Sequence, residues 1–190
     1  MQKYNAFTSK NTKGLVRELI TPAFVRSGTN LGLPKEEMKA IRCNAVWDTG
    51  ATNTVIDEKL AEQLKLKPVT KIPARGVNGD FITNVYWIDI LLPNKVEVLS
   101  IKVTEGKLRD GTSLLIGMNI ITLGDFSVTN ADGKTCFSFR TPSCKEIDYV
   151  SEWEKRNEKV KAAEDRATIK AKRKQERKAK KKNLRRKKKK

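Results

Sequence analysis

Short apolar runs separated by turn residues follow one another over the first three quarters of the chain, and this pattern predicts a β domain. The Asn78-Gly79 pair predicts a tight hairpin turn, because both residues accept a positive φ. Many short strands joined by such turns are typical of a mostly-β barrel or sandwich. The pattern predicts strands at 15–25, 41–47, 70–75, 81–92, 96–103, 114–116, 126–128 and 135–139, and short helical turns at 33–40, 58–66 and 119–122. Asp57 is expected to cap the second of these helical turns.

The last 40 residues have a different composition. Residues 151–190 hold 20 basic and 6 acidic side chains, whereas residues 1–150 hold 20 basic and 16 acidic ones. We therefore expect a folded domain over 1–147 and a Lys/Arg-rich tail over 148–190, helical at first and disordered by its end. A capping box of Ser151 and Glu154 is expected to start the helix.

The side chains that the protein lacks exclude much chemistry. The chain contains no histidine, which removes Ser-His-Asp and Cys-His nucleophile systems and histidine metal sites. Its 3 cysteines form no C-x-x-C pair and are too few for a four-thiolate zinc site. We therefore expect no metal and no cofactor. An enzyme with this composition would use carboxylates, hydroxyls or lysines.

The sequence shows neither a signal peptide near its N-terminus nor a run of apolar residues long enough to span a membrane. An odd number of cysteines also argues against a disulfide framework. We therefore expect a soluble cytoplasmic protein.

The segment most informative about function is an apolar strand that leads directly into Asp48-Thr49-Gly50-Ala51. Glycine permits a tight turn and lets backbone N–H groups face the carboxylate of Asp48. Apolar flanks give a dry setting, which shifts the pKa of a carboxyl group. Alone, Asp-Thr-Gly is equally compatible with an ordinary Asx-type turn after a strand.

A second motif, Leu114-Leu115-Ile116-Gly117, favours a functional role for Asp48 over an ordinary turn. Together the two motifs resemble those of the retropepsin-like aspartic proteases, in particular the compact bacterial members, and the resemblance covers about residues 15–140. The glycine-rich hairpin tip at 76–79 lies between the motifs, where that family has its flap. The resemblance implies an acid-protease β-barrel and an aspartic endopeptidase that acts on polypeptides.

The chemistry of that family needs two aspartates, and this chain has one Asp-Thr-Gly. The resemblance therefore implies a homodimer in which each protomer supplies one Asp48 and the pair shares a proton. One carboxylate would activate a water and the other would donate to the scissile carbonyl, with no metal or covalent intermediate. The other implied site residues are Thr49, Gly50, Ala51 and Gly117, which support the active-site loop, and Gly76, Val77, Asn78 and Gly79, which form the flap over the substrate.

The sequence departs from the viral pattern at two positions. Viral members usually carry an aspartate directly after the first motif and an arginine directly after the second, and the two pair. Here these positions are Thr52 and Met118, so both halves of the ion pair are missing together. Residues 27–40 also look like an insertion before the catalytic strand.

Two other functions remain open at this point. The first is a non-catalytic dimeric module that binds extended peptides in the same groove. The second is a nucleic-acid-associated protein that binds DNA, RNA or another polyanion through residues 170–190. A solvated tail without a partner explains the same charge pattern equally well.

Overall fold

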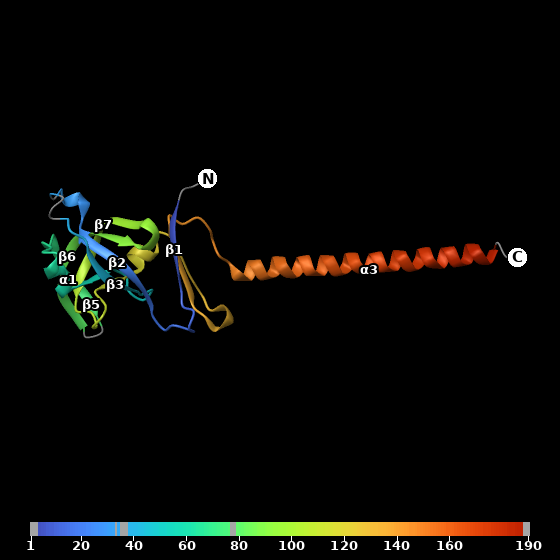
Figure 1. Ribbon diagram of the computed structural model, residues 1–190, viewed down its shortest axis with the longest axis horizontal. Coiled ribbons are helices and arrows are strands. Elements are labelled where there is room, and N and C mark those ends of the chain that lie inside the picture. The colour runs from blue at the N-terminus through green and yellow to red at the C-terminus, as the bar shows by residue number, and fades with distance from the viewer. Residues whose placement is uncertain (1–3, 33, 35–37, 77–78, 188–190) are drawn as a thin grey trace. The chain divides into compact units, whose positions relative to one another are not determined.

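A computed structural model describes residues 4–32, 34, 38–76 and 79–187 (Figure 1). The chain divides into two compact units, Met1–Lys145 and Glu146–Lys190, where the sequence predicted a boundary after residue 147. The first unit is built mainly from strands and the second is one long helix.

Within the described residues, six strands of a seven-stranded sheet close into a barrel, and the seventh strand, at the end of the sheet order, pairs with one of the six. The ring closes because β2 pairs antiparallel with β6 over the register that runs from Phe24–Leu91 to Ser27–Ile88. The mostly-β class predicted from the sequence is therefore confirmed. In sheet order the strands are β2 (Leu19–Ser27), β3 (Ile41–Trp47), β8 (Leu114–Ile116), β4 (Val55–Asp57), β7 (Val96–Gly106), β6 (Gly79–Leu92) and β5 (Thr70–Gly76).

The helical elements of this unit are short. Those that fall within the described residues are η1 (Thr29–Leu31), α1 (Glu58–Gln63), η3 (Pro93–Lys95), α2 (Met118–Ile121) and η4 (Ala131–Gly133). As predicted, Asp57 caps α1, because its carboxylate accepts a hydrogen bond from the backbone N–H of Lys59. The helix ends before the predicted residue 66, since Lys65 adopts a φ of 50° and leaves the helical region. Of the helical turn predicted at 33–40, residues 33 and 35–37 lie outside the described residues.

A second, three-stranded sheet has the order β1 (Asn5–Lys10), β10 (Cys136–Thr141) and β9 (Asp125–Thr129). The sequence did not predict β1, because Phe7 is its only buried side chain and one position gives no alternation. The sheet packs on the barrel through aromatic side chains gathered around Trp47. Ring centroids lie 5.0 Å from Trp47 for Phe139, 5.1 Å for Phe137, 5.9 Å for Phe126 and 6.0 Å for Phe7.

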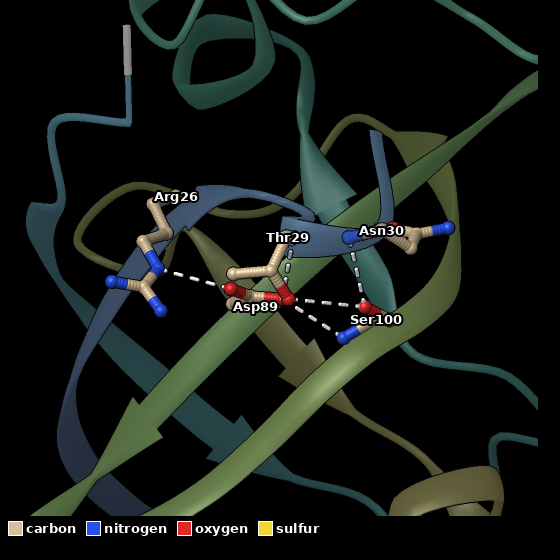
Figure 2. Close-up of polar contacts among 5 residues, drawn as sticks. All are labelled: Arg26, Thr29, Asn30, Asp89 and Ser100. Atoms are coloured by element: carbon tan, nitrogen blue, oxygen red, sulfur yellow. Dashed lines mark hydrogen bonds and ion pairs between the residues drawn. The ribbon is translucent and has the colours of Figure 1, made fainter. Parts of the chain in front are cut away.

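A fully buried carboxylate, Asp89, ties three segments of the barrel together (Figure 2). It accepts hydrogen bonds from Arg26 Nε of β2 at 3.0 Å and from the Ser100 backbone N–H of β7 at 2.8 Å. The Thr29 backbone N–H of η1 adds a third at 3.2 Å. The register of β6 against β7 shifts between Ile88 and Ile90, beside the aspartate. Burial of this charge is tolerated because it is both ion-paired and hydrogen-bonded.

The second unit contains α3 (Tyr149–Lys187). Asp148 caps it, since its carboxylate accepts hydrogen bonds from the backbone N–H groups of Val150 at 2.9 Å and Ser151 at 3.1 Å. The predicted capping box of Ser151 and Glu154 is therefore wrong, because both residues lie inside the helix and Asp148 precedes it. The helix continues to Lys187, and the disorder expected at the very end of the tail stays a prediction. This stretch has no glycine or proline and is rich in Ala, Lys, Arg, Glu and Gln, which are good helix formers. No helix within the described residues is long and apolar enough to cross a bilayer.

Removal of the Asp89 carboxylate should destabilise the barrel strongly. The variant Asp89→Ala leaves Arg26 without its partner and the backbone N–H of Ser100 without its acceptor. We expect the free energy of unfolding to fall by about 3 kcal/mol, measured by urea denaturation of the full chain.

The matched control is Asp80→Ala, which breaks the ion pair between Arg75 and Asp80 on the exposed β5–β6 hairpin. Both of these side chains are mostly exposed, so no measurable change is expected. Equal effects of the two substitutions would contradict the structural role given to Asp89.

Candidate active site

Asp48 is the first residue after β3, and the neighbouring strand fixes its backbone. β3 runs parallel to β8 with Trp47 opposite Ile116, and the Asp48 N–H donates to the Ile116 carbonyl at 2.9 Å. Side chains alternate along β3, so Trp47 points into the core while the half-buried Asp48 points outward. The Trp47 indole N–H donates to the Thr21 hydroxyl at 2.9 Å, and both side chains are buried.

The loop after β3 turns back onto the Asp48 carboxylate. The Gly50 N–H donates to Asp48 Oδ1 at 2.8 Å, and the Ala51 N–H donates to the Asp48 carbonyl at 3.3 Å. A Cβ atom on Gly50 would lie 3.2 Å from Asp48 Oδ1, which is a tight contact. Thr49 is exposed at the surface of this loop. The structure therefore brings the first motif together around one partly exposed carboxylate.

Gly117, at the end of the second motif, lies directly against the backbone of the same loop. A Cβ atom there would come within 2.5 Å of the Asn53 carbonyl oxygen and 2.8 Å of the Ala51 carbonyl oxygen. The φ of Gly117 is −96°, which any residue adopts, so space and not backbone conformation requires glycine. The two motifs, far apart in the sequence, thus meet in van der Waals contact.

Backbone hydrogen bonds join the loop that contains Thr52 to the start of α2, which contains Met118. The Met118 N–H donates to the Ala51 carbonyl at 2.8 Å, and the Asn119 N–H donates to the Thr52 carbonyl at 3.1 Å. The loop and the start of α2 are therefore connected through main-chain atoms. This connection needs no charged side chain at position 52 or 118.

Sequence reasoning missed two supporting residues, Thr54 and Asn119. The fully buried Thr54 donates its hydroxyl to Asn119 Oδ1 at 2.8 Å and its backbone N–H to the same oxygen at 2.9 Å. The Thr54 hydroxyl in turn accepts from the Gly117 N–H at 3.1 Å. Asn119 is the one polar residue in the apolar stretch 118–121, and this was the signal that could have found it. Thr54 ends the polar run Thr52-Asn53-Thr54 and gives no such signal.

An apolar strip adjoins Asp48 on the outer face of the barrel. Strand alternation puts Val46 on the Asp48 face, and the registers place Ile20 and Leu115 on either side of it. Ile20 is 43% exposed, and Val46 and Leu115 are half-buried. Close to the start of β2, the Arg109 guanidinium binds both carboxylate oxygens of Glu18.

The predicted flap is a β hairpin. Gly76 of β5 pairs with Gly79 of β6, and the Gly79 φ of +107° is one that glycine adopts readily. The other two predicted flap residues, Val77 and Asn78, lie outside the described residues. The Arg75 Nε and an Asp80 carboxylate oxygen are 2.7 Å apart next to the turn.

Cysteine and metal chemistry find no support in this unit. Cys43 lies on β3 close to the site, but burial raises the pKa of its thiol to about 11, so the reactive thiolate is scarce at neutral pH. Among the residues whose positions are described, no three Cys, Asp or Glu side chains are grouped to hold a metal ion.

Comparison with known proteins agrees with the motifs. The family model described as aspartyl protease matches residues 38–120, a segment that contains both Asp48 and Gly117. This match confirms the resemblance to aspartic proteases that the sequence indicated. A comparison with curated proteins gave no match.

Three solved structures are similar to the chain. A retropepsin-like aspartic protease from Rickettsia conorii has 15% identity and a TM-score of 0.42, with 74% of this chain and 99% of that one covered. The EIAV protease in complex with the inhibitor HBY-793 has 17% identity and a TM-score of 0.41, with 58% and 91% covered. The retroviral protease-like domain of Ddi1 from Leishmania major has 14% identity and a TM-score of 0.41, with 65% and 95% covered.

The contact between Thr54 and the second motif predicts a cost for losing one hydroxyl. Thr54→Val keeps the side-chain volume but leaves the Gly117 N–H without its acceptor. We expect the free energy of unfolding to fall by about 1–3 kcal/mol in urea denaturation. Thr112→Val is the matched control, because Thr112 is also buried and its hydroxyl makes no hydrogen bond to another described residue. Similar losses for the two variants would contradict the role given to Thr54.

Proposed function

We propose that the protein is a homodimeric aspartic endopeptidase whose catalytic water is held between the Asp48 carboxylates of two protomers. The observation that carries this proposal is the fixed and partly exposed Asp48 carboxylate. It is bound by the Gly50 N–H at 2.8 Å, on a loop that packs without a gap on Gly117. Close packing and a backbone hydrogen bond that hold one carboxylate in place are typical of a functional site, where the position of the carboxylate matters.

The need for two chains follows from the single motif. Asp48 is hydrogen-bonded to loop backbone and to no carboxylate of the described residues. The nearby Glu18 is already paired with Arg109. A second carboxylate must therefore come from another copy, and a two-fold axis beside the loop would bring the two Asp48 side chains together. The exposed Thr49 would then face the partner loop and connect the two protomers.

Two adjacent carboxylates cannot both be ionised, so the pair would hold one proton over a range of pH. The ionised member would take a proton from the bridging water as the water attacks the amide carbon. The protonated member would donate to the carbonyl oxygen, and a proton would then pass to the leaving nitrogen.

The surroundings of Asp48 indicate how a substrate would bind. The apolar strip of Ile20, Val46 and Leu115 would receive an apolar side chain next to the scissile bond. The Gly76–Gly79 hairpin would cover an extended peptide and hydrogen-bond its backbone. The alternative function is a dimeric module that binds peptides at the same place without cleaving them.

The first prediction of this proposal concerns the carboxylate itself. The parent protein should cleave a pool of diverse unstructured peptides, with a maximum at mildly acidic pH, because the pair must carry a single proton. Asp48→Asn should abolish cleavage while urea denaturation and dimer mass stay unchanged, since the amide keeps the side-chain volume. A folded, dimeric parent protein that binds peptides and cleaves none would support the binding module instead.

The second prediction tests the sharing of one site by two chains. Parent and Asp48→Asn proteins mixed in equal amounts, with full exchange of protomers, should retain about one quarter of the activity of the same total amount of parent protein. If each chain acted alone, about one half would remain. Sedimentation of the mixture serves as the control that exchange and dimerisation have taken place.

A further inference from the structure

The charges of α3 are segregated along its length. The first part, residues 149–165, holds 4 basic and 5 acidic side chains. The second part, residues 166–187, holds 13 basic side chains and one acidic one, Glu176. We call this second part the basic segment. A solvated helix that served only solubility would need no such division, and neither does the proposed peptidase reaction.

The charge density of the basic segment approaches that of a nucleic acid. A helix rises about 1.5 Å per residue, so the basic segment is about 33 Å long and carries one cation in roughly every 2.5 Å. Duplex DNA carries one phosphate charge in about every 1.7 Å of its axis. The two charge densities are therefore of the same order, with opposite sign.

The basic side chains from 166 to 178 surround the helix axis and are open to solvent. Every residue from 166 to 178 is exposed. Because Lys172, Arg173 and Lys174 are consecutive, their side chains point about 100° apart around the helix. Ile169, which is 53% exposed, is the one large apolar side chain among residues 166–178. None of the cations from 166 to 178 is ion-paired within the described part of the chain.

We propose that the basic segment of α3, Arg166–Lys187, binds the phosphate backbone of nucleic acid. Phosphate groups at regular spacing match closely spaced Lys and Arg residues along one helix. A membrane surface fits less well, because an interfacial helix needs an apolar face opposite its charges. The segment contains no aromatic side chain for stacking on bases, so the binding is independent of sequence.

This binding would be separate from the chemistry at Asp48. The near-neutral part of α3 lies between the basic segment and the barrel in the chain and spans about 25 Å as a helix. Contact of the basic segment with a polyanion therefore needs no residue of the active-site loop. The consequence is a peptidase concentrated where nucleic acid and its bound proteins are found.

The test is a titration of the full chain into a labelled DNA duplex of about 30 base pairs, followed by fluorescence anisotropy. Release of counterions makes the affinity fall steeply with salt, by about 10³-fold between 50 and 200 mM for roughly six phosphate contacts. Labelled duplex RNA and single-stranded RNA of the same length identify the preferred form. Binding is measured on the Asp48→Asn protein as well, so a failure of the proposed peptidase activity leaves this result intact.

Two quadruple variants distinguish binding by the basic segment from an effect of the net charge of the whole chain. One carries Lys172→Gln, Arg173→Gln, Lys174→Gln and Arg177→Gln in the basic segment, and the other carries Lys155→Gln, Arg156→Gln, Lys159→Gln and Lys161→Gln in the near-neutral part. Both lose four charges, and circular dichroism checks that both keep the helix. We expect the first to weaken binding at least tenfold at about 100 mM salt and to flatten the slope of log K against log salt by about 3, and the second to change the slope by less than about 1.

Equal effects of the two variants would overturn the proposal, because net charge alone would then explain the binding. A full chain that binds none of the three nucleic acids at low salt would overturn it too. So would stronger binding to vesicles that contain phosphatidylserine than to any nucleic acid, since the segment would then recognise a membrane surface.

Discussion

The parallel pairing of β3 with β8 is the constraint on which the rest of the site depends. It places Ile116 opposite Trp47, so the next backbone group along each strand belongs to Asp48 and Gly117. The strands end together, and the loops that follow them have to pass one another at once. Only a residue without a Cβ fits at 117, because the Asn53 carbonyl oxygen occupies the space where a side chain would begin. A change of register by one residue would turn Asp48 toward the core and separate it from Gly50.

The buried Trp47 at the end of β3 helps to hold the neighbouring Asp48 in place. Trp47 hydrogen-bonds to Thr21 on β2 and packs against the aromatic rings of the three-stranded sheet, so its neighbours come from both sheets. Because Asp48 follows directly, a shift of the Asp48 backbone would disturb this aromatic cluster. The aspartate thus follows directly on a residue of the buried core, although its own loop is exposed. A rigid attachment of this kind is what a pair of carboxylates sharing one proton requires, since small displacements change their coupling.

The parts of the structure that were predictable from sequence are those in which local patterns and tertiary contacts agree. The strand at 41–47, the Asp57 cap and the β5–β6 hairpin follow from apolar runs and turn residues. β1 could not be found in this way, since its pairing with β10 joins residues more than 120 positions apart. Its own sequence shows only one buried side chain, which gives no strand pattern. Thr54 and Asn119 were missed because each looks like an ordinary polar residue until β4 and α2 are brought together. The cap of α3 was misplaced because Asp148 and Ser151 both suit that position, and only the observed hydrogen bonds distinguish them.

The two notable aspartates of the barrel illustrate opposite uses of the same side chain. Asp89 has no exposed surface, and its bonds to Arg26, Thr29 and Ser100 use both carboxylate oxygens, which suits a purely structural role. Asp48 accepts one hydrogen bond from Gly50 through Oδ1, and its other oxygen accepts none from the described residues. An oxygen that accepts no hydrogen bond from the fold can accept one from a water, a substrate or a protonated second carboxyl group. This difference in unused hydrogen-bonding capacity, more than the identity of the residue, supports the proposal that Asp48 is the catalytic group.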